Sequence, residues 1–177
     1  MTGSKFHNYK HFFIIIVFVL ASSDYKFIWA YTSAKGFNSD ATIYNASELK
    51  AALETNTIVG WPRPEPLPND TEDVPYFIVG DDAFALRTYL MKPYSHCQLT
   101  REERIFNYRL FRARRVVENA FGILANIFQV LLTTMQHEAE AVGLIVKACP
   151  VLHNFMRTWY PQMQNRYLDK PGANGDW

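Results

Sequence analysis

The sequence predicts an α/β fold, and three observations lead to that prediction. Two apolar runs near the start, residues 12–21 and 25–31, have the β-branched and aromatic composition of strands, with a Ser-Ser-Asp turn between them. A third strand-like run, residues 76–79, ends at a glycine. Residues 99–129 have the length and apolar spacing of a long helix. At 177 residues, one domain is expected.

Composition limits the possible functions. Hydrophobic residues make up 49% of the chain, which is enough for a core. The net charge of +1 excludes a global basic field, so any nucleic-acid-binding surface is expected to be a local patch. Cys97 and Cys149 form neither a disulfide framework nor a metal motif, and they fit free thiols in a reducing compartment.

Residues 12–21 have two interpretations. The run follows two lysines like a signal peptide, and glycosylation sequons at Asn45 and Asn69 would suit a secreted chain. It is too short to span a bilayer as a helix. Its β-branched richness instead favours a buried strand that pairs with residues 25–31 in a hairpin. We favour the hairpin, and a small secreted or membrane-associated protein is the alternative.

The middle of the chain is predicted to contain little regular structure. Residues 32–44, including Asp40, are expected to form a loop. Residues 48–55 are expected to form a short helix, capped by Asn45 or Ser47. Residues 60–75 carry five prolines and are expected to be an extended surface connector.

The carboxyl-terminal part is predicted to be helical. The sequence Thr-Arg-Glu-Glu at residues 100–103 is a capping box that marks the start of the long helix. A second helix is expected over residues 138–158, with a kink or break near Pro150. On that helix, His153 is interpreted as a hydrogen-bonded core residue. The tail, residues 161–177, is expected to be loose.

Two acidic residues are candidate metal ligands. Asp81 follows Gly80 directly after the strand at residues 76–79, and ligands of open α/β sheets collect at the carboxyl ends of strands. Glu118 lies mid-helix among basic and apolar neighbours. Brought together by the fold, the two acids would offer the hard oxygen ligands that Mg²⁺ and Mn²⁺ prefer. Taken alone, the first is typical of a turn and the second of a surface charge.

Longer runs carry a family resemblance: GDDAFALRTYLMKPYS, LTREERIFNYRLFRARRVVENAFGILANIFQVLLTT and VLHNFMRTWY. They resemble the Harbinger (PIF-like) transposases, which belong to the DDE superfamily of endonucleases. The resemblance implies an RNase H-like fold over residues 1–160, with a mixed sheet flanked by helices. It also implies a nuclease that cuts DNA with divalent metals, in which Asp81 and Glu118 match the second catalytic Asp and the catalytic Glu.

The resemblance further implies partners and a location. Arg114 and Arg115 precede Glu118 by four and three residues, and we expect them to contact DNA phosphates. A plain salt bridge to Glu118 agrees equally well with the spacing. A Myb-like DNA-binding protein is a possible partner, and a nuclear or cytoplasmic location without stable membrane association is expected. A non-catalytic DNA- or protein-interaction module is the alternative function.

One part of the family pattern has no match. The family's first catalytic Asp lies on a strand upstream of the run that resembles residues 8–10, and no acid precedes Asp24. We therefore expect a truncated RNase H-like fold without its first strand, and an incomplete or inactive nuclease. Asp40 is the acid that would have to replace the missing ligand.

Overall fold

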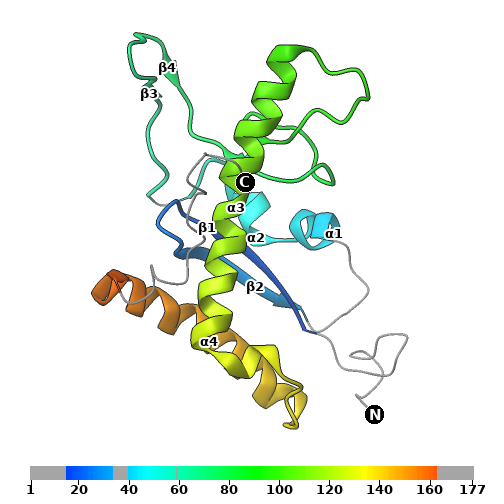
Figure 1. The fold of residues 1–177 in the computed structure, drawn as a ribbon, viewed down its shortest axis with the longest axis vertical. Helices are drawn as coiled ribbons and strands as arrows, with labels where there is room; N and C mark the ends of the chain where they lie inside the picture. The colour runs from blue at the N-terminus through cyan, green and yellow to red at the C-terminus, as the bar shows by residue number, and fades with distance from the viewer. Residues whose placement is uncertain (1–14, 34–39, 59, 163–177) are drawn as a thin grey trace, which may run out of the picture. The chain divides into compact units, whose positions relative to one another are not determined.

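An antiparallel hairpin forms the amino-terminal part of the fold (Figure 1). The computed structural model describes residues 15–33, 40–58 and 60–162. Strands β1 (Ile16–Ala21) and β2 (Phe27–Ser33) pair through a turn in which the Tyr25 N–H donates to the Ser22 carbonyl at 2.9 Å. The predicted hairpin is therefore confirmed over residues 16–33, while residues 12–14 lie outside the described part.

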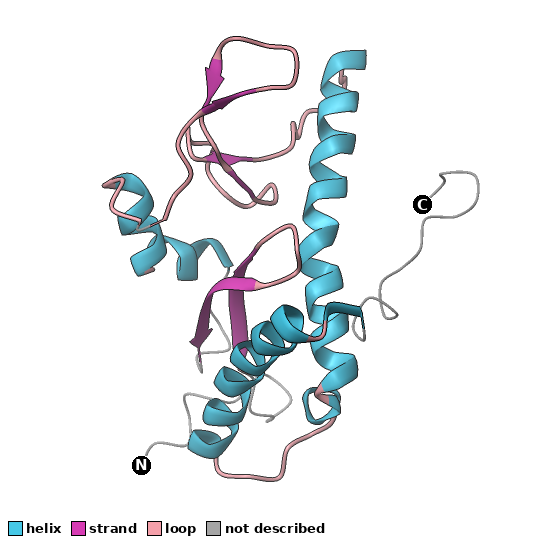
Figure 2. Ribbon diagram, turned by 90° about the vertical axis from the view of Figure 1, so that its left-hand side faces the viewer, coloured by secondary structure: helices cyan, strands magenta, loops and turns pink. Residues whose placement is uncertain are grey.

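The remaining elements are short ladders and helices (Figure 2). In chain order they are α1 (Asp40–Asn45), α2 (Glu48–Glu54), β3 (Glu65–Pro66), β4 (Asp73–Val74), β5 (Ile78–Val79), β6 (Leu90–Met91), α3 (Arg101–Ile127), a 3-10 helix η2 (Gln129–Leu132) and α4 (Ala139–Trp159). Strands β3 and β4 pair in antiparallel fashion, and β5 and β6 pair in parallel. The chain is thus mixed α/β, as the sequence predicted.

The chain divides into two units, each described by itself. Unit 1 comprises Met1–Phe37 and Arg115–Trp177, and unit 2 comprises Asn38–Arg114. The boundary between the units falls within α3, which is one continuous helix. The long helix predicted over residues 99–129 is therefore confirmed for Arg101–Ile127.

The core of unit 1 forms around Phe27 of β2. This ring packs with Ala120 and Leu124, which lie one turn apart on α3, and with Cys149 of α4. The Phe27 and Phe121 rings lie 5.4 Å apart, a separation typical of favourable aromatic pairs. Burial of these apolar side chains holds the hairpin against both helices.

Hydrogen bonds from α4 fix the hairpin within this core. The Asn154 amide bonds to both backbone groups of Phe27: its Oδ1 accepts from the N–H and its Nδ2 donates to the C=O, each at 2.9 Å. A side-chain amide thus takes the place of a neighbouring strand. His153 is fully buried, and its Nε2 donates to the Tyr25 carbonyl at 2.7 Å. The interpretation of His153 as a hydrogen-bonded core residue is confirmed.

Arg157 completes this set of contacts one turn further along α4. Its Nε donates to the Asp24 carbonyl at 3.1 Å, and its guanidinium lies 5.4 Å from the centre of the Tyr25 ring. A kink or a split of this helix was expected near Ala148. The split is wrong, because α4 continues through the buried Pro150. Packing of the helix on both sides of Pro150 offsets the loss of one backbone hydrogen bond. Residues 163–177, most of the tail expected to be loose, lie outside the described residues.

Unit 2 has a small core around its first helices. The N-cap of α2 is Ser47, whose side chain accepts from the Lys50 N–H at 3.2 Å, so the predicted helix and one of its two candidate caps are confirmed. The buried apolar side chains of this unit are Ile43, Tyr44, Leu49, Leu53, Leu90 and Leu110. The capping box of α3 also forms, because Thr100 Oγ1 accepts from the Glu103 N–H and Glu103 Oε2 accepts from the Thr100 N–H.

The predictions for residues 32–44 and 76–79 are wrong. Residues 32–44 are not a loop throughout, because β2 continues to Ser33 and Asp40 is the first residue of helix α1. A helix this short is unstable alone, and burial of Ile43 and Tyr44 stabilises it. The run 76–79 is not a buried strand: Tyr76 and Phe77 are 43% and 41% exposed, since the partner strand β6 extends the ladder over only two residues.

Candidate active site

Asp81 lies just past the carboxyl end of β5, where the sequence placed it. Two backbone hydrogen bonds hold the parallel ladder up to this point. The Ile78 N–H donates to the Tyr89 carbonyl and the Gly80 N–H donates to the Met91 carbonyl, both at 2.9 Å. A Cβ on Gly80 would lie 3.0 Å from the Phe84 ring, so a side chain here would require that ring to shift. The backbone that carries Asp81 is therefore anchored on its strand side.

The Asp81 carboxylate closes a turn with one of its two oxygens. Its Oδ1 accepts from the Ala83 N–H at 3.0 Å, and its carbonyl accepts from the Phe84 N–H at 3.3 Å. Among the described residues, Oδ2 has no hydrogen-bond partner, and the side chain is half-buried. The turn orients the carboxylate while one oxygen remains available as a ligand.

The neighbouring Asp82 is engaged differently. Its Oδ1 forms an ion pair with Lys92 Nζ at 3.1 Å, and the same ammonium donates to the Asp82 carbonyl at 3.0 Å. The charge of Asp82 is thus locally neutralised, and this side chain is a weaker candidate ligand than Asp81. The sequence analysis did not predict the role of Lys92, which lies ten residues away from its partner.

Glu118 is exposed on α3, in unit 1. Within the part of the chain that the structure describes, its carboxylate forms no ion pair or hydrogen bond. The salt bridge to Arg114 or Arg115 that the spacing allowed is therefore not formed. Both Glu118 oxygens remain available to an external ligand.

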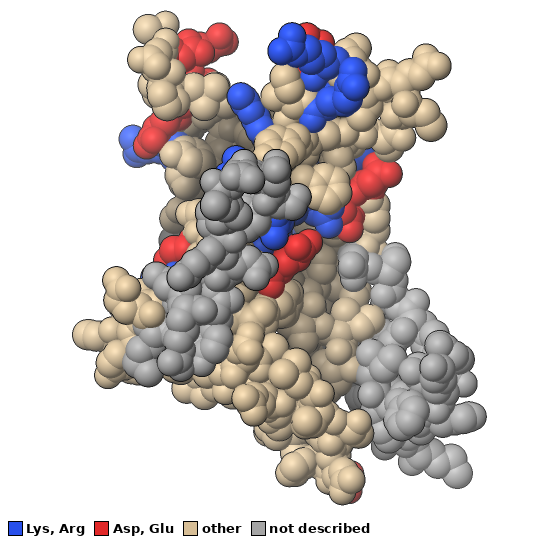
Figure 3. Space-filling view, in the orientation of Figure 1, with Lys and Arg blue, Asp and Glu red and all other residues tan. Residues whose placement is uncertain are grey.

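The arginines of α3 differ in exposure. Arg101, Arg104, Arg109 and Arg112 are exposed, whereas the two candidate phosphate contacts, Arg114 and Arg115, are half-buried. Figure 3 shows Lys and Arg side chains gathered over the amino-terminal part of α3. The exposed arginines of α3 therefore precede Arg114 and Arg115 along the helix.

Arg114 and Arg115 also have contacts of their own. The Arg114 guanidinium lies 5.7 Å from the centre of the Phe111 ring, a cation–π distance, and Arg115 also interacts within the protein. These contacts orient the two side chains but leave their positive charge in place. Both residues keep the charge that a phosphate contact requires.

The candidate metal ligands divide between the two units. Asp81 belongs to unit 2 and Glu118 to unit 1, while Asp40, the candidate replacement, begins α1 in unit 2. No group of three or more His, Cys, Asp or Glu side chains suited to a metal ion occurs among the described residues. The available donors are carboxylate oxygens, which fit Mg²⁺ or Mn²⁺ in kind.

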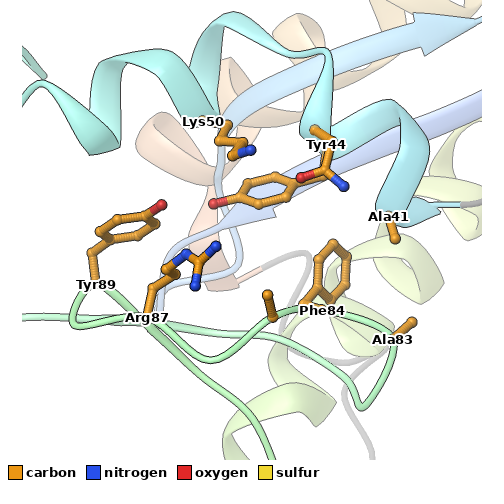
Figure 4. A pocket seen from close by; sticks show the side chains of 9 residues that line it. Ala41, Tyr44, Lys50, Ala83, Phe84, Arg87 and Tyr89 are labelled. Carbon is orange, nitrogen blue, oxygen red and sulfur yellow. The ribbon is translucent and has the colours of Figure 1, made fainter.

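A pocket in unit 2 was missed by the sequence analysis. The polar side chains that line it come from separate segments. Tyr44 lies on α1 and Lys50 on α2, whereas Arg87 and Tyr89 lie just before β6. These side chains point toward one another (Figure 4). Nothing in the spacing of these residues marks them as neighbours. The pocket is considered further below.

The mixed α/β fold is consistent with an α/β nuclease-like domain. The chain belongs to the DDE superfamily endonucleases, because the model of that family matches residues 1–154. Members of this superfamily generally use divalent metals. No curated protein and no solved structure matched the chain. In the part that the structure describes, no helix combines the length and apolar character needed to cross a membrane.

Proposed function

We propose that the protein is a transposase-derived nuclease of the Harbinger (PIF-like) type, with DNA as its substrate and Mg²⁺ or Mn²⁺ as its cofactor. The family match over residues 1–154 carries this proposal. The position of Asp81 supports it, since a carboxylate at the carboxyl end of a parallel strand with one unengaged oxygen is suited to metal binding. The proposed domain is part of an RNase H-like fold over residues 1–160.

In this proposal Asp81 and Glu118 share a divalent cation. A bound metal of this kind supplies an activated water and stabilises the leaving oxygen of a phosphodiester. Asp81 contributes an oriented carboxylate and Glu118 an exposed one. Arg114 and Arg115 hold the DNA phosphate, because a guanidinium matches the geometry of phosphate oxygens.

We propose further that the 177-residue chain alone does not cut DNA. Two-metal hydrolysis requires enough carboxylates to hold two cations about 3.5–4 Å apart. Asp81 and Glu118 supply two carboxylates, and Asp40 is the acid available to join them. One loosely held cation positions the reactants poorly, and a displacement of about 1 Å costs on the order of 10²-fold in rate.

The test is incubation of the purified chain with plasmid and Mn²⁺, beside an Asp81→Asn variant. Asparagine can keep the bond from the Ala83 N–H to the side-chain oxygen, so the turn persists while the charge is lost. Asp81→Ala removes both, and Asp82→Asn is the matched control beside the site. No cleavage by any of them is the expected result. Cleavage that only the Asp81 variants abolish would show an active site completed by another acid, and Asp40→Asn would then identify it.

DNA binding is tested separately from cleavage. Reversing the charge of Arg114 and Arg115 to Glu should weaken binding of a duplex and lower its salt dependence by about 0.9 per lost phosphate contact. Because both side chains are half-buried, the Gln variants are measured beside them. Arg63→Gln, an exposed arginine of the proline-rich connector, is the control. Unchanged affinity and salt dependence in all variants would remove these arginines from the proposed interface.

A second candidate function is a non-catalytic DNA- or protein-interaction module. The four exposed arginines of α3, Arg101, Arg104, Arg109 and Arg112, favour it, because they provide a basic surface that needs no metal. Duplex binding that is independent of Mn²⁺ and of Asp81 would support this module. Direct titration with a Myb-like DNA-binding protein tests the proposed partner.

We propose a nuclear location, which a nuclease acting on chromosomal DNA requires. Fractionation of cells that express the protein tests this location. A product glycosylated at Asn45 or Asn69 would place the chain in the secretory pathway and contradict the nuclear proposal.

A further inference from the structure

The pocket of unit 2 has a volume of about 110 Å³. It is lined by Ala41, Tyr44, Asn45, Lys50, Ala83, Phe84, Ala85, Arg87 and Tyr89, all from unit 2. Tyr44 is buried, whereas Asn45, Ala83, Ala85 and Arg87 are exposed. The pocket therefore has a buried tyrosine and several exposed lining residues, and it is large enough for a group of a few heavy atoms.

The charged side chains that line this pocket, Lys50 and Arg87, are both cations. Lys50 Nζ lies 3.6 Å from Glu54 Oε1, one turn along α2, and the Tyr89 hydroxyl donates to the same oxygen at 3.4 Å. Arg87 donates through Nη1 to the Leu86 carbonyl at 3.3 Å and has no carboxylate partner among the described residues. Arg87 is therefore the cation of the lining that no carboxylate partner neutralises among the described residues.

The tyrosine hydroxyls of the pocket are already engaged within the protein, Tyr89 with Glu54 and Tyr44 with a partner of its own. Burial, together with the nearby Tyr89 hydroxyl and Glu54 carboxylate, raises the pKa of Tyr44 well above its usual range. Tyr44 therefore stays protonated at neutral pH. Figure 4 shows the two hydroxyls pointing toward each other, with Lys50 and Arg87 beside them. The Lys50 ammonium and the Arg87 guanidinium each carry several N–H donors, so the pocket suits an anion with several acceptor oxygens.

We propose that this pocket binds one phosphate group of a DNA backbone, a site separate from the candidate metal ligands. The proposal rests on the proposed function for its choice of DNA. Ala83, Phe84 and Ala85 line the pocket and directly follow Asp81 and Asp82, so a bound phosphate would lie on the turn that carries the candidate catalytic carboxylate. The pocket would act by positioning the strand and not by chemistry.

The same chemistry would also accept free inorganic phosphate, and charge favours the backbone source. A phosphodiester carries one negative charge and neutralises the pocket. Inorganic phosphate, in contrast, is partly doubly charged at neutral pH. A second negative charge would face Glu54 near its ion pair with Lys50. The pocket is thus matched to the singly charged group.

The first experiment measures binding of a fluorescent duplex to the full chain by anisotropy, at several salt concentrations. Arg87→Gln should lower affinity about 3- to 10-fold and reduce the slope of log K against log salt by about 0.9, as expected for one phosphate contact. Tyr44→Phe removes a donor at constant shape and should weaken binding less, with the slope unchanged. Arg63→Gln is the matched control, since it removes an equally exposed arginine outside the pocket.

A second arm titrates inorganic phosphate and follows the backbone amide signals of Ala83 and Ala85. Perturbation by duplex at micromolar concentration, with phosphate acting only at much higher concentration, supports the proposal. Saturation by phosphate with no duplex effect would assign the pocket to the free anion and overturn it. An Arg87→Gln duplex affinity and slope equal to those of Arg63→Gln would also overturn it. If the Arg114 and Arg115 variants still weakened binding, the proposed function would stand without the pocket.

Discussion

Hydrogen bonds in the two units join very different parts of the chain. In unit 1, bonds from α4 to the hairpin connect residues 127, 128 and 133 positions apart. In unit 2, the Asn107 amide bonds to Tyr94 across 13 positions, and the Tyr89 hydroxyl reaches Glu54 across 35. Unit 1 therefore depends on long-range side-chain bonds, whereas unit 2 depends on nearer ones.

This difference separates structural polar residues from available ones. In unit 1, His153 and Arg157 of α4 are buried and Asn154 is half-buried, and all three bond to backbone groups of the hairpin. In unit 2, Asp81, Arg87 and Lys50 remain partly accessible next to a turn and a pocket. A buried polar group that is satisfied contributes to specificity of the fold, while an accessible one can bind a ligand.

The largest effect is expected at Asn154. Asn154→Ala leaves the N–H and C=O of Phe27 without their partners, and each unsatisfied group costs about 1–3 kcal/mol. Unfolding in urea should therefore show a loss of roughly 3 kcal/mol. Hydrogen exchange at the Phe27 amide should accelerate by the factor that corresponds to this loss of unfolding free energy.

Asn126→Ala is the control for this prediction. Asn126 also bonds through its amide, to the Gly122 carbonyl at 2.9 Å, but it is exposed and on one helix. Its loss should cost no more than about 0.5 kcal/mol, as is usual for surface positions. Equal costs for the two variants would mean that the bonds to Phe27 do not hold the hairpin.

A pH-dependent effect is expected at His153. Burial lowers its pKa below the ordinary 6.5, while the bond to Tyr25 opposes that shift and nearby Arg157 adds to it. The unfolded chain therefore binds a proton at a higher pH than the folded chain. The neutral residue contributes its full stability above pH 6.5, and this contribution is lost as pH falls below that value. The slope is at most about 1.4 kcal/mol per pH unit.

Unfolding free energies measured between pH 7.5 and 5 test this expectation. His153→Gln can still donate to the Tyr25 carbonyl and does not titrate, so this variant should lose the His153 part of the slope. His137→Gln, an exposed histidine in the same unit, should keep it. A slope unchanged in the first variant would show that other groups cause the acid sensitivity.

The same substitution should act with opposite sign at two glycines. In unit 2, a Cβ at Gly80 would meet the Phe84 and Leu90 side chains at 3.0 and 3.2 Å, so Gly80→Ala should destabilise by about 1 kcal/mol or more. In unit 1, a Cβ at Gly122 of α3 meets nothing within 4 Å, and Gly122→Ala should stabilise by about 0.5–1 kcal/mol. Thermal unfolding of both variants provides the comparison. Stabilisation by Gly80→Ala would show that the turn before Asp81 is loosely packed.

Sequence patterns predicted the elements whose signals are local. The capping box at Thr100, the cap at Ser47 and the hairpin turn each need only a few consecutive residues, and all three form. The position of Asp81 at the end of a strand was predicted correctly because its signal is also local: Gly80 marks the point where the chain leaves the strand. The role of the acid as ligand stays a prediction.

The failures concern properties that depend on distant partners. Tyr76 and Phe77 have strand composition but are exposed, because the neighbouring strand is short. Helix α1 at Asp40 forms through burial against its own unit and not through propensity. The pocket at Arg87 joins segments that no sequence period relates. Tertiary context decided each of these cases.

The smallest effects are expected at the helix starts, where the two units differ again. In unit 2, the side chain of Thr100 caps α3, and Thr100→Ala should cost about 0.5–1 kcal/mol because the Glu103 N–H loses its acceptor. In unit 1, the N-cap residue of α4 is Glu138, with φ −56° and ψ 142°. Its side chain forms no capping hydrogen bond. A shorter acid reaches the first-turn N–H groups better, so Glu138→Asp should stabilise by a few tenths of a kcal/mol, up to about 1. Urea unfolding at 0.1 and 1 M salt separates capping from charge effects, since a hydrogen-bonded cap persists at high salt and a dipole interaction is screened. Destabilisation by Glu138→Asp at both salt concentrations would mean that the longer side chain already serves the start of α4 in another way.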